Sequence, residues 1–135
     1  MSVGQLTDGE LGTVPAVRAL LVALAVFLGS CSGPDAPDVA VCRDLVTRLC
    51  LGPLCEPTTT KLGVDAASCE ATLLMRTGCG ADSFSFTTPT RAQVLDCRVP
   101  LLRQGASQKV RPACADVAEV FTDCPDLVRF FGGTP

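Results

Sequence analysis

The chain has 135 residues, enough for one domain, with 11 Lys and Arg against 14 Asp and Glu and a formal net charge of −3. The basic residues are scattered singly, so the basic face that a nucleic-acid-binding domain needs is missing, and no nucleic-acid partner is expected. The chain contains no His, which excludes Ser–His–Asp and Cys–His catalysis in cis and zinc sites that require imidazole. Nine Cys in so short a chain indicate a disulfide scaffold in an exported protein, or a metal binder in a reduced compartment.

The amino-terminal segment decides between these two alternatives. Its apolar run, Ala19–Leu28, is ten residues long, whereas a membrane-spanning helix needs about 20. The run suits the hydrophobic region of a signal peptide, and Arg18 suits its positive flank. Residues 1–17 carry two acidic residues and no Lys or Arg, which is atypical before such a run. One hypothesis is that translation starts downstream, at Val14 or Val17.

The apolar run ends in Leu28-Gly29-Ser30-Cys31. This sequence of one aliphatic residue, two small residues and a cysteine resembles the lipobox of bacterial lipoproteins, and the resemblance covers about the first 31 residues. It implies that residues 1–30 are a signal peptide removed by a dedicated peptidase. It also implies that the Cys31 thiol receives a diacylglycerol and that the new amino group is acylated, for example with palmitate. The alternatives are an ordinary signal peptide, or an apolar segment that a cysteine happens to follow.

An acylated Cys31 would make the membrane the first partner of the protein, because two or three acyl chains hold a protein firmly on a bilayer. Such a protein is exported and lipid-anchored in the cell envelope. The residue after the lipidated cysteine is Ser32 rather than Asp, which by family analogy leans toward the outer membrane over the inner. Residues 31–38 contain two Pro, one Gly and two acidic residues, and are expected to be an extended lipidated tether.

Removing Cys31 from the count leaves eight cysteines, an even number, which predicts four disulfides with 105 connectivities open. No C-x2-C pair exists, and the shortest gap runs from Cys50 to Cys55. Structural zinc sites and dithiol redox sites both favour that close spacing, so no metal and no cofactor is expected. The disulfide cysteines are Cys42, Cys50, Cys55, Cys69, Cys79, Cys97, Cys114 and Cys124.

Apolar residues recur at helical spacing through residues 39–135, which predicts an all-α, disulfide-stapled bundle of about four helices. In the first helix this spacing places Arg43, Asp44 and Arg48 off the apolar face. Residues 55–60 are expected to form a loop, and residues 83–87 an ordered loop that packs one or two Phe against the core. The expected helices are Asp38–Leu51 with Asp38 as N-cap, Asp65–Thr77 with Gly78 as stop, a third that begins near Thr88 and kinks at Pro100, Pro112–Thr122, and a last short turn from Cys124 to Phe131.

Two pairs of cysteines share one spacing, since nine residues separate Cys69 from Cys79 and Cys114 from Cys124. This resembles the twin C-x9-C pattern of small helical-hairpin proteins, whose two antiparallel helices are stapled at both ends. The resemblance implies the pairs Cys69–Cys124 and Cys79–Cys114. The sequence departs from that pattern, because 34 residues and a further predicted helix separate the two halves, so other connectivities stay open.

The candidates for carboxylate catalysis are Asp82, Asp96, Asp116 and Glu119, on residue type alone. Asp116 and Glu119 lie one helical turn apart, where a solvated outer face is the favoured interpretation. No Gly-rich phosphate loop or nucleophile elbow is present, and the protein is not expected to be an enzyme.

The sequence therefore predicts a non-enzymatic, lipid-anchored, disulfide-stabilised envelope module that acts by contact with an unidentified envelope protein or as an envelope component. Phe130 and Phe131 could form an exposed patch for such contact or a last part of the core. The alternative is a carrier of a lipid or other apolar ligand, similar in helix and cysteine number to plant lipid-transfer proteins but without their Cys-Cys and Cys-x-Cys motifs. Its helical cage would be lined by Leu73, Leu74, Met75, Leu101, Leu102 and Phe121.

Overall fold

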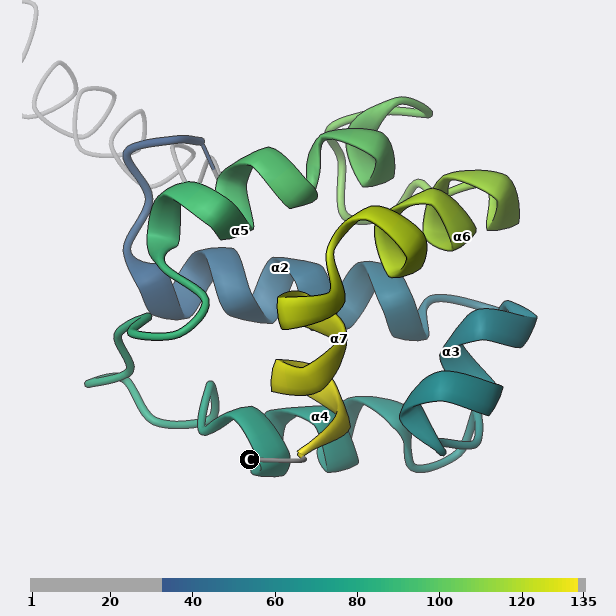
Figure 1. Cartoon of the computed structure of the whole chain (residues 1–135), viewed down its shortest axis with the longest axis horizontal. Helices are drawn as coiled ribbons and strands as arrows, with labels where there is room; N and C mark the ends of the chain where they lie inside the picture. Colours follow the sequence, from purple (N-terminus) through teal and green to yellow (C-terminus); the bar gives the residue numbers. More distant parts are fainter. Residues whose placement is uncertain (1–32, 134–135) are drawn as a thin grey trace, which may run out of the picture. The chain divides into compact units, whose positions relative to one another are not determined.

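A computed structural model of the chain describes residues 33–133, which form an all-helical domain without a strand (Figure 1). The lipobox and the proposed start codons lie outside the described residues. The all-α prediction is confirmed, but the helix count of about four is wrong, because six α-helices and one 3-10 helix are present in the described part. These are α2 Asp38–Cys50, α3 Glu56–Leu62, α4 Cys69–Thr77, α5 Arg91–Cys97, η1 Val99–Leu102, α6 Cys114–Asp123 and α7 Pro125–Gly132.

The two additional helices are α3 and α7. The sequence of α3 contains a proline and three consecutive threonines, which favour a loop, yet Thr58 and Leu62 are buried one turn apart on its inner side. Helix α7 replaces the expected short turn, and its spacing buries Leu127 and Phe131 in the same way. In both helices the free energy of burying one apolar face outweighs weak intrinsic propensity.

The starts of the helices differ from the sequence-based expectation. Helix α4 begins four residues after Asp65, because the Asp65 carboxylate accepts a hydrogen bond from the Ser68 N–H at 2.8 Å in a turn before the helix. Helix α5 begins after Thr90, whose side chain and Gln93 form a capping box. Asp38 is the first residue of α2, not its N-cap, and its side chain caps no backbone N–H of that helix.

The Asp38 side chain joins α2 to two later segments. It accepts a hydrogen bond from the Phe86 N–H at 2.9 Å and pairs with the Arg91 guanidinium. These contacts, the Phe86 hydrogen bond first, hold the pKa of Asp38 below its ordinary value of 3.8. Since folding favours the ionised carboxylate, its contribution to stability is present above the ordinary pKa and is lost as the pH falls through the lowered pKa.

Helix α2 lies between α5 and α4, and α7 crosses between α6 and α4 (Figure 1). The core residues of α2 are fully or almost fully buried, and so are Leu73 of α4 and Val94 of α5. Phe84 and Phe86 are partly buried and pack against Phe130, with ring centroids 6.1 and 5.9 Å from it. Phe131 is 1% exposed, so it belongs to the core rather than to a surface patch.

Residues 33–37, within the segment expected to be an extended tether, form a hydrogen-bonded turn against the domain. The Ala36 N–H donates to the Gly33 carbonyl at 3.0 Å, and Ala36 is 8% exposed. The Arg91 guanidinium donates to the carbonyls of Pro34 and Ala36, both at 2.5 Å. Arg91 thus fastens this turn to the start of α5.

Candidate functional site

All eight cysteines of the domain are paired in disulfides, with Cα–Cα distances between 5.4 and 6.1 Å. The pairs implied by the twin C-x9-C resemblance are wrong, because Cys69 and Cys79 both bond to α2 rather than to the α6 cysteines. The observed pairs are Cys42–Cys79, Cys50–Cys69, Cys55–Cys114 and Cys97–Cys124.

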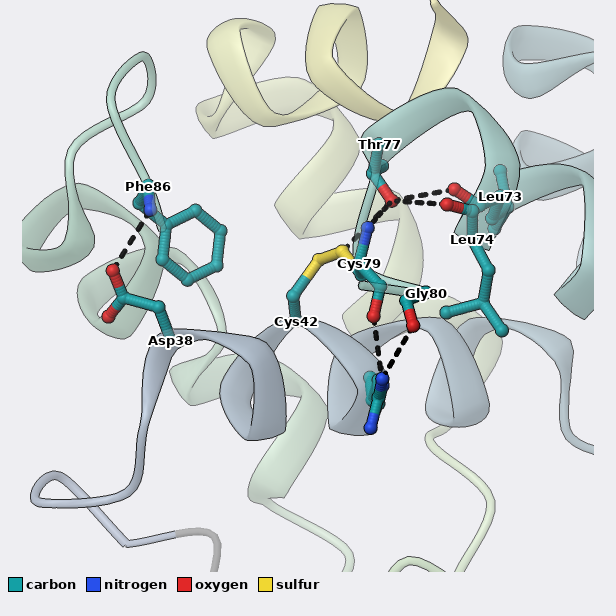
Figure 2. Close-up of a disulfide and its surroundings, with 9 residues drawn as sticks. Asp38, Cys42, Leu73, Leu74, Thr77, Cys79, Gly80 and Phe86 are labelled. Carbon is teal, nitrogen blue, oxygen red and sulfur yellow. Dashed lines mark hydrogen bonds between the residues drawn. A yellow bond between two sulfur atoms is a disulfide. The ribbon is translucent and has the colours of Figure 1, made fainter. Parts of the chain in front are cut away.

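Helices α2 and α4 are clamped at both ends. Cys42 and Cys50 of α2 bond to Cys79 and Cys69 respectively, so the two helices run antiparallel between two bridges. Figure 2 shows the first bridge, where Cys79 follows the end of α4 and the Thr77 hydroxyl bonds to the carbonyls of that helix. The C-x9-C segment Cys69–Cys79 is therefore half of a helical clamp, but its partner is the C-x7-C segment Cys42–Cys50.

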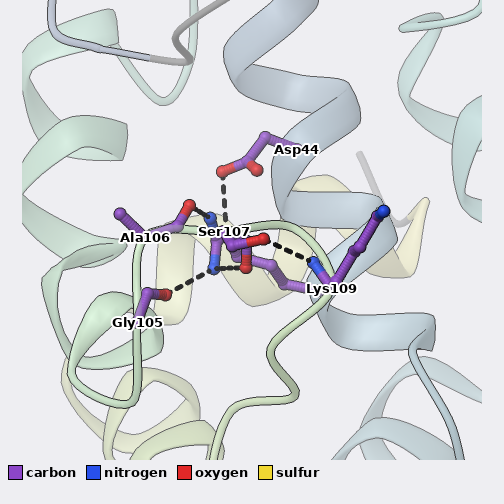
Figure 3. A network of polar contacts seen from close by, with 6 residues as sticks. Asp44, Gly105, Ala106, Ser107 and Lys109 are labelled. Carbon is purple, nitrogen blue, oxygen red and sulfur yellow. Dashed lines mark hydrogen bonds and ion pairs between the residues drawn. The ribbon is translucent and has the colours of Figure 1, made fainter.

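A buried ion pair lies within α2. Asp44 and Arg48 were expected to lie off the apolar face, yet both side chains are fully buried, with 2.9 Å between Asp44 Oδ2 and Arg48 Nε. The guanidinium also donates to the carbonyls of Gly105, Ala106 and Ser107, so it holds the loop after η1 (Figure 3). This prediction was wrong because helical periodicity does not distinguish a charge buried with a partner from a solvated one.

Two adjacent depressions flank the Cys97–Cys124 bridge, with volumes of about 240 and 250 Å³. They share Asp96, Cys97, Asp123 and Cys124 as a common wall. Because each aspartate immediately precedes a bridged cysteine, the bridge places Asp96 of α5 and Asp123 of α6 on the same wall. Their apolar lining comes from Pro89, Val94, Val99, Pro100, Val120, Pro125 and Leu127.

The charge of these depressions is negative. Their lining contains four carboxylates and one guanidinium, that of Arg103, which is engaged with Asp116 and Glu119. Asp96 and Asp123 are exposed, and neither carboxylate forms an ion pair or hydrogen bond within the part of the chain that the structure describes. Two carboxylates are thus available to a cationic group that approaches over the bridge.

The four carboxylates considered as catalytic candidates do not lie in one site. Asp82 pairs with Arg43 at 3.0 Å. Asp116 is buried, against the expectation of a solvated position, and accepts a hydrogen bond from Arg103 at 3.0 Å. Hydrogen bonds from Arg103 hold the pKa of Glu119 below its ordinary value. A carboxyl that acts as a general acid at neutral pH needs a raised pKa instead. Asp96, beside Cys97, lines the same depression as Glu119, but its carboxylate does not share the Arg103 guanidinium.

The residues of the expected apolar cage are distributed between core and surface. Leu73, Leu101 and Phe121 are buried in the core, whereas Met75 is 78% exposed. Of the six cage residues, Leu74 alone lines one of the described depressions, an open one of about 450 Å³ beside Cys50 and Ala71. These positions give the six side chains no common cavity among the described depressions.

Within residues 33–133, no helix is long and apolar enough to cross a bilayer, and no three His, Cys, Asp or Glu side chains are grouped to hold a metal ion. Comparison with protein-family models, curated proteins and solved structures finds no match to the chain. The function must therefore be argued from the residues of this chain.

Proposed function

We propose that the protein is a non-enzymatic, lipid-anchored module of the cell envelope that acts by binding another protein through the double depression beside Cys97–Cys124. The observation that carries the proposal is the pair of carboxylates, Asp96 and Asp123, between two largely apolar hollows on a disulfide-fixed surface. The lipobox resemblance supplies the anchor at Cys31, and the four bridges agree with an exported protein.

The chemistry of the depressions favours a partner segment with a Lys or Arg between apolar side chains. The cationic group would lie over Asp96 and Asp123, and its apolar neighbours would enter the hollows around Val99 and Leu127. Opposite charge at an exposed rim steers association and selects the partner, and apolar burial contributes affinity. Because a disulfide joins α5 to the junction of α6 and α7, this surface needs little reorganisation on binding.

The anchor is tested by replacing Cys31 with Ala. We expect the wild-type chain to fractionate with membranes and to carry acyl mass, and the variant to lose both, because no acyl chain can then be attached. Fractionation with intact-mass spectrometry measures this directly. Cys31→Ser in a second strain is the matched control for side-chain size. A variant that remains in the membrane fraction with unchanged mass contradicts lipidation at Cys31.

The binding surface is tested with the double variant Asp96→Asn/Asp123→Asn. With a peptide of alternating Lys and Leu as probe, we expect affinity to fall about tenfold or more, because both unpaired carboxylates are lost. The control Glu56→Gln/Glu70→Gln removes the same charge from two exposed sites on α3 and α4 and should bind like the wild type. Equal loss in both variants would show non-specific attraction to an acidic protein and would refute the site.

A further inference from the structure

The Cys55–Cys114 bridge differs from the other three in its surroundings. Cys114 is exposed at the start of α6, whereas the cysteines of the other three bridges are buried, as are Cys42, Cys69 and Cys79, or partly buried, as are Cys50, Cys97 and Cys124. Cys55 is 6% exposed and lies before α3. An external thiolate therefore meets this bridge from the side of Cys114.

A guanidinium lies against both sulfur atoms of this bridge. Arg111 Nη2 is 3.4 Å from Cys114 Sγ and 3.6 Å from Cys55 Sγ, and it also donates to the Pro53 carbonyl. The turn before Pro53 packs against the same side chain, since a Cβ on Gly52 would lie 3.4 Å from Arg111 Cδ. Gly52 has a φ of +71°, a conformation that favours glycine and brings the backbone close to the arginine.

A fixed cation beside a disulfide makes it more susceptible to thiol exchange. The thiolate that leaves when the bridge opens is stabilised by the positive charge, and a thiol of lower pKa leaves faster. Cys114 is also the first residue of the ten-residue α6, where the helix dipole favours a thiolate. The described guanidinium contacts to disulfide sulfur atoms are at Cys55 and Cys114, whereas Cys79 Sγ is contacted by the Thr77 hydroxyl.

We infer that Cys55–Cys114 is a thiol-exchange site, which a dithiol reductant opens in preference to the other three bridges. This inference does not depend on the lipid anchor or on the acidic depressions. It assigns Arg111 as the residue that positions a positive charge at the reacting sulfur atoms.

The exchange balances as two successive substitutions at sulfur. A thiolate of the dithiol attacks Cys114 Sγ, a mixed disulfide forms, the Cys55–Cys114 bond breaks, and its electron pair leaves on Cys55 Sγ beside Arg111. The second thiolate of the dithiol then attacks the dithiol sulfur in the mixed disulfide. This forms the cyclic disulfide and releases Cys114 as a thiolate. The dithiol loses two electrons and becomes a cyclic disulfide, and its two protons pass through solvent to the two cysteines.

The fold around the bridge allows it to open locally. Leu62 of α3 and Val117 of α6 belong to the buried core, so we expect these helices to stay packed when the bridge opens. The loop between η1 and α6 keeps a second attachment at Arg48. Opening should therefore free Arg111 and the Gly52–Pro53 turn while the α2–α4 clamp remains closed.

The test uses the full chain with its four bridges formed. It is treated with limiting dithiothreitol at neutral pH and quenched with N-ethylmaleimide over time, and the labelled cysteines are mapped by peptide mass spectrometry. We expect Cys55 and Cys114 to be labelled first. Arg111→Gln should slow their labelling about threefold or more, whereas Lys109→Gln should not. Lys109 is exposed on the same loop, and its side chain has no hydrogen bond or ion pair in the described part of the chain.

A second measurement needs no variant. Raising the salt to about 1 M shortens the Debye length to about 3 Å, so the wild-type rate should fall toward that of Arg111→Gln, while the variant's own rate changes little. Circular dichroism after labelling of this bridge alone should show the helices retained. First labelling at any other bridge overturns the inference, and so does equal labelling of the Arg111 and Lys109 variants.

Discussion

Replacing Asp44 with Ala should lower the free energy of unfolding by about 3–5 kcal/mol, the range typical for removing one partner of a buried ion pair. The Arg48 guanidinium would remain fully buried without its carboxylate. Burial lowers the pKa of the Arg98 guanidinium, and the negative charge of Asp44 opposes this effect. The variant would therefore also take the Asp44 carboxylate away from this second buried cation. Urea denaturation followed by circular dichroism, with the disulfides intact, measures the loss.

The control for this prediction is Asp44→Ala/Arg48→Met. Removing both charges avoids the uncompensated guanidinium, so most of the lost stability should return. Residues 105–107 would lose their hydrogen bonds to Arg48, and their backbone amides should exchange hydrogen faster although the fold is stable. A double variant no more stable than Asp44→Ala would mean that the positive charge of Arg48 is not what makes the single variant unstable.

Removing the Cys42–Cys79 bridge by replacing both cysteines with Ala should cost about 4 kcal/mol from chain entropy alone, for a closed loop of 37 residues. Both cysteines are 0% exposed, so the truncation also leaves a cavity and adds to that cost. The end of α4 would then depend on Arg43, which donates to the carbonyls of Cys79 and Gly80 at 2.8 Å. The midpoint of thermal unfolding measures the effect.

The comparison variant is Cys97→Ala/Cys124→Ala. Its loop of 27 residues is of similar length, but its cysteines are only partly buried, so we expect a smaller loss of stability. Chain entropy alone would rank the Cys55–Cys114 bridge highest, because it closes 59 residues. The loss of stability could instead follow loop length, so that removing Cys55–Cys114 costs more than removing Cys42–Cys79. That result would show that burial of the α2–α4 clamp contributes little.

The helices that follow an apolar period were predictable from the sequence, and those that depend on their neighbours were not. Helix α2 ends one residue from its predicted end, because its apolar residues recur regularly and Gly52-Pro53 follows. Helix α3 was missed because Pro57 and three threonines favour a loop locally, while burial of Thr58 and Leu62 against other segments stabilises the helix. Local propensity is a weak guide where tertiary contacts decide.

The candidate sites depend on pairings that spacing alone does not specify. The i, i+4 spacing of Asp44 and Arg48 suits a surface pair as well as a buried one, so nothing in α2 indicates that the pair is covered by residues 105–107. Asp96 and Asp123 are 27 positions apart and line the same depressions beside the Cys97–Cys124 bridge. The burial of the Asp44–Arg48 pair depends on the loop packed over it, and the Asp96/Asp123 wall depends on a disulfide. Both are properties of the folded domain, not of local spacing.

If Cys31 is acylated, as we propose, the Arg91 contacts with Pro34 and Ala36 would limit how far the domain can stand from a membrane. Gly33 begins the turn that these contacts fasten to α5, and it is two residues after Cys31. Two extended residues reach at most about 7 Å. A chain acylated at Cys31 would therefore rest almost directly on the lipid headgroups, with the first turns of α2 and α5 toward them. Its freedom to rotate would be small, and its partner would have to approach along the membrane surface.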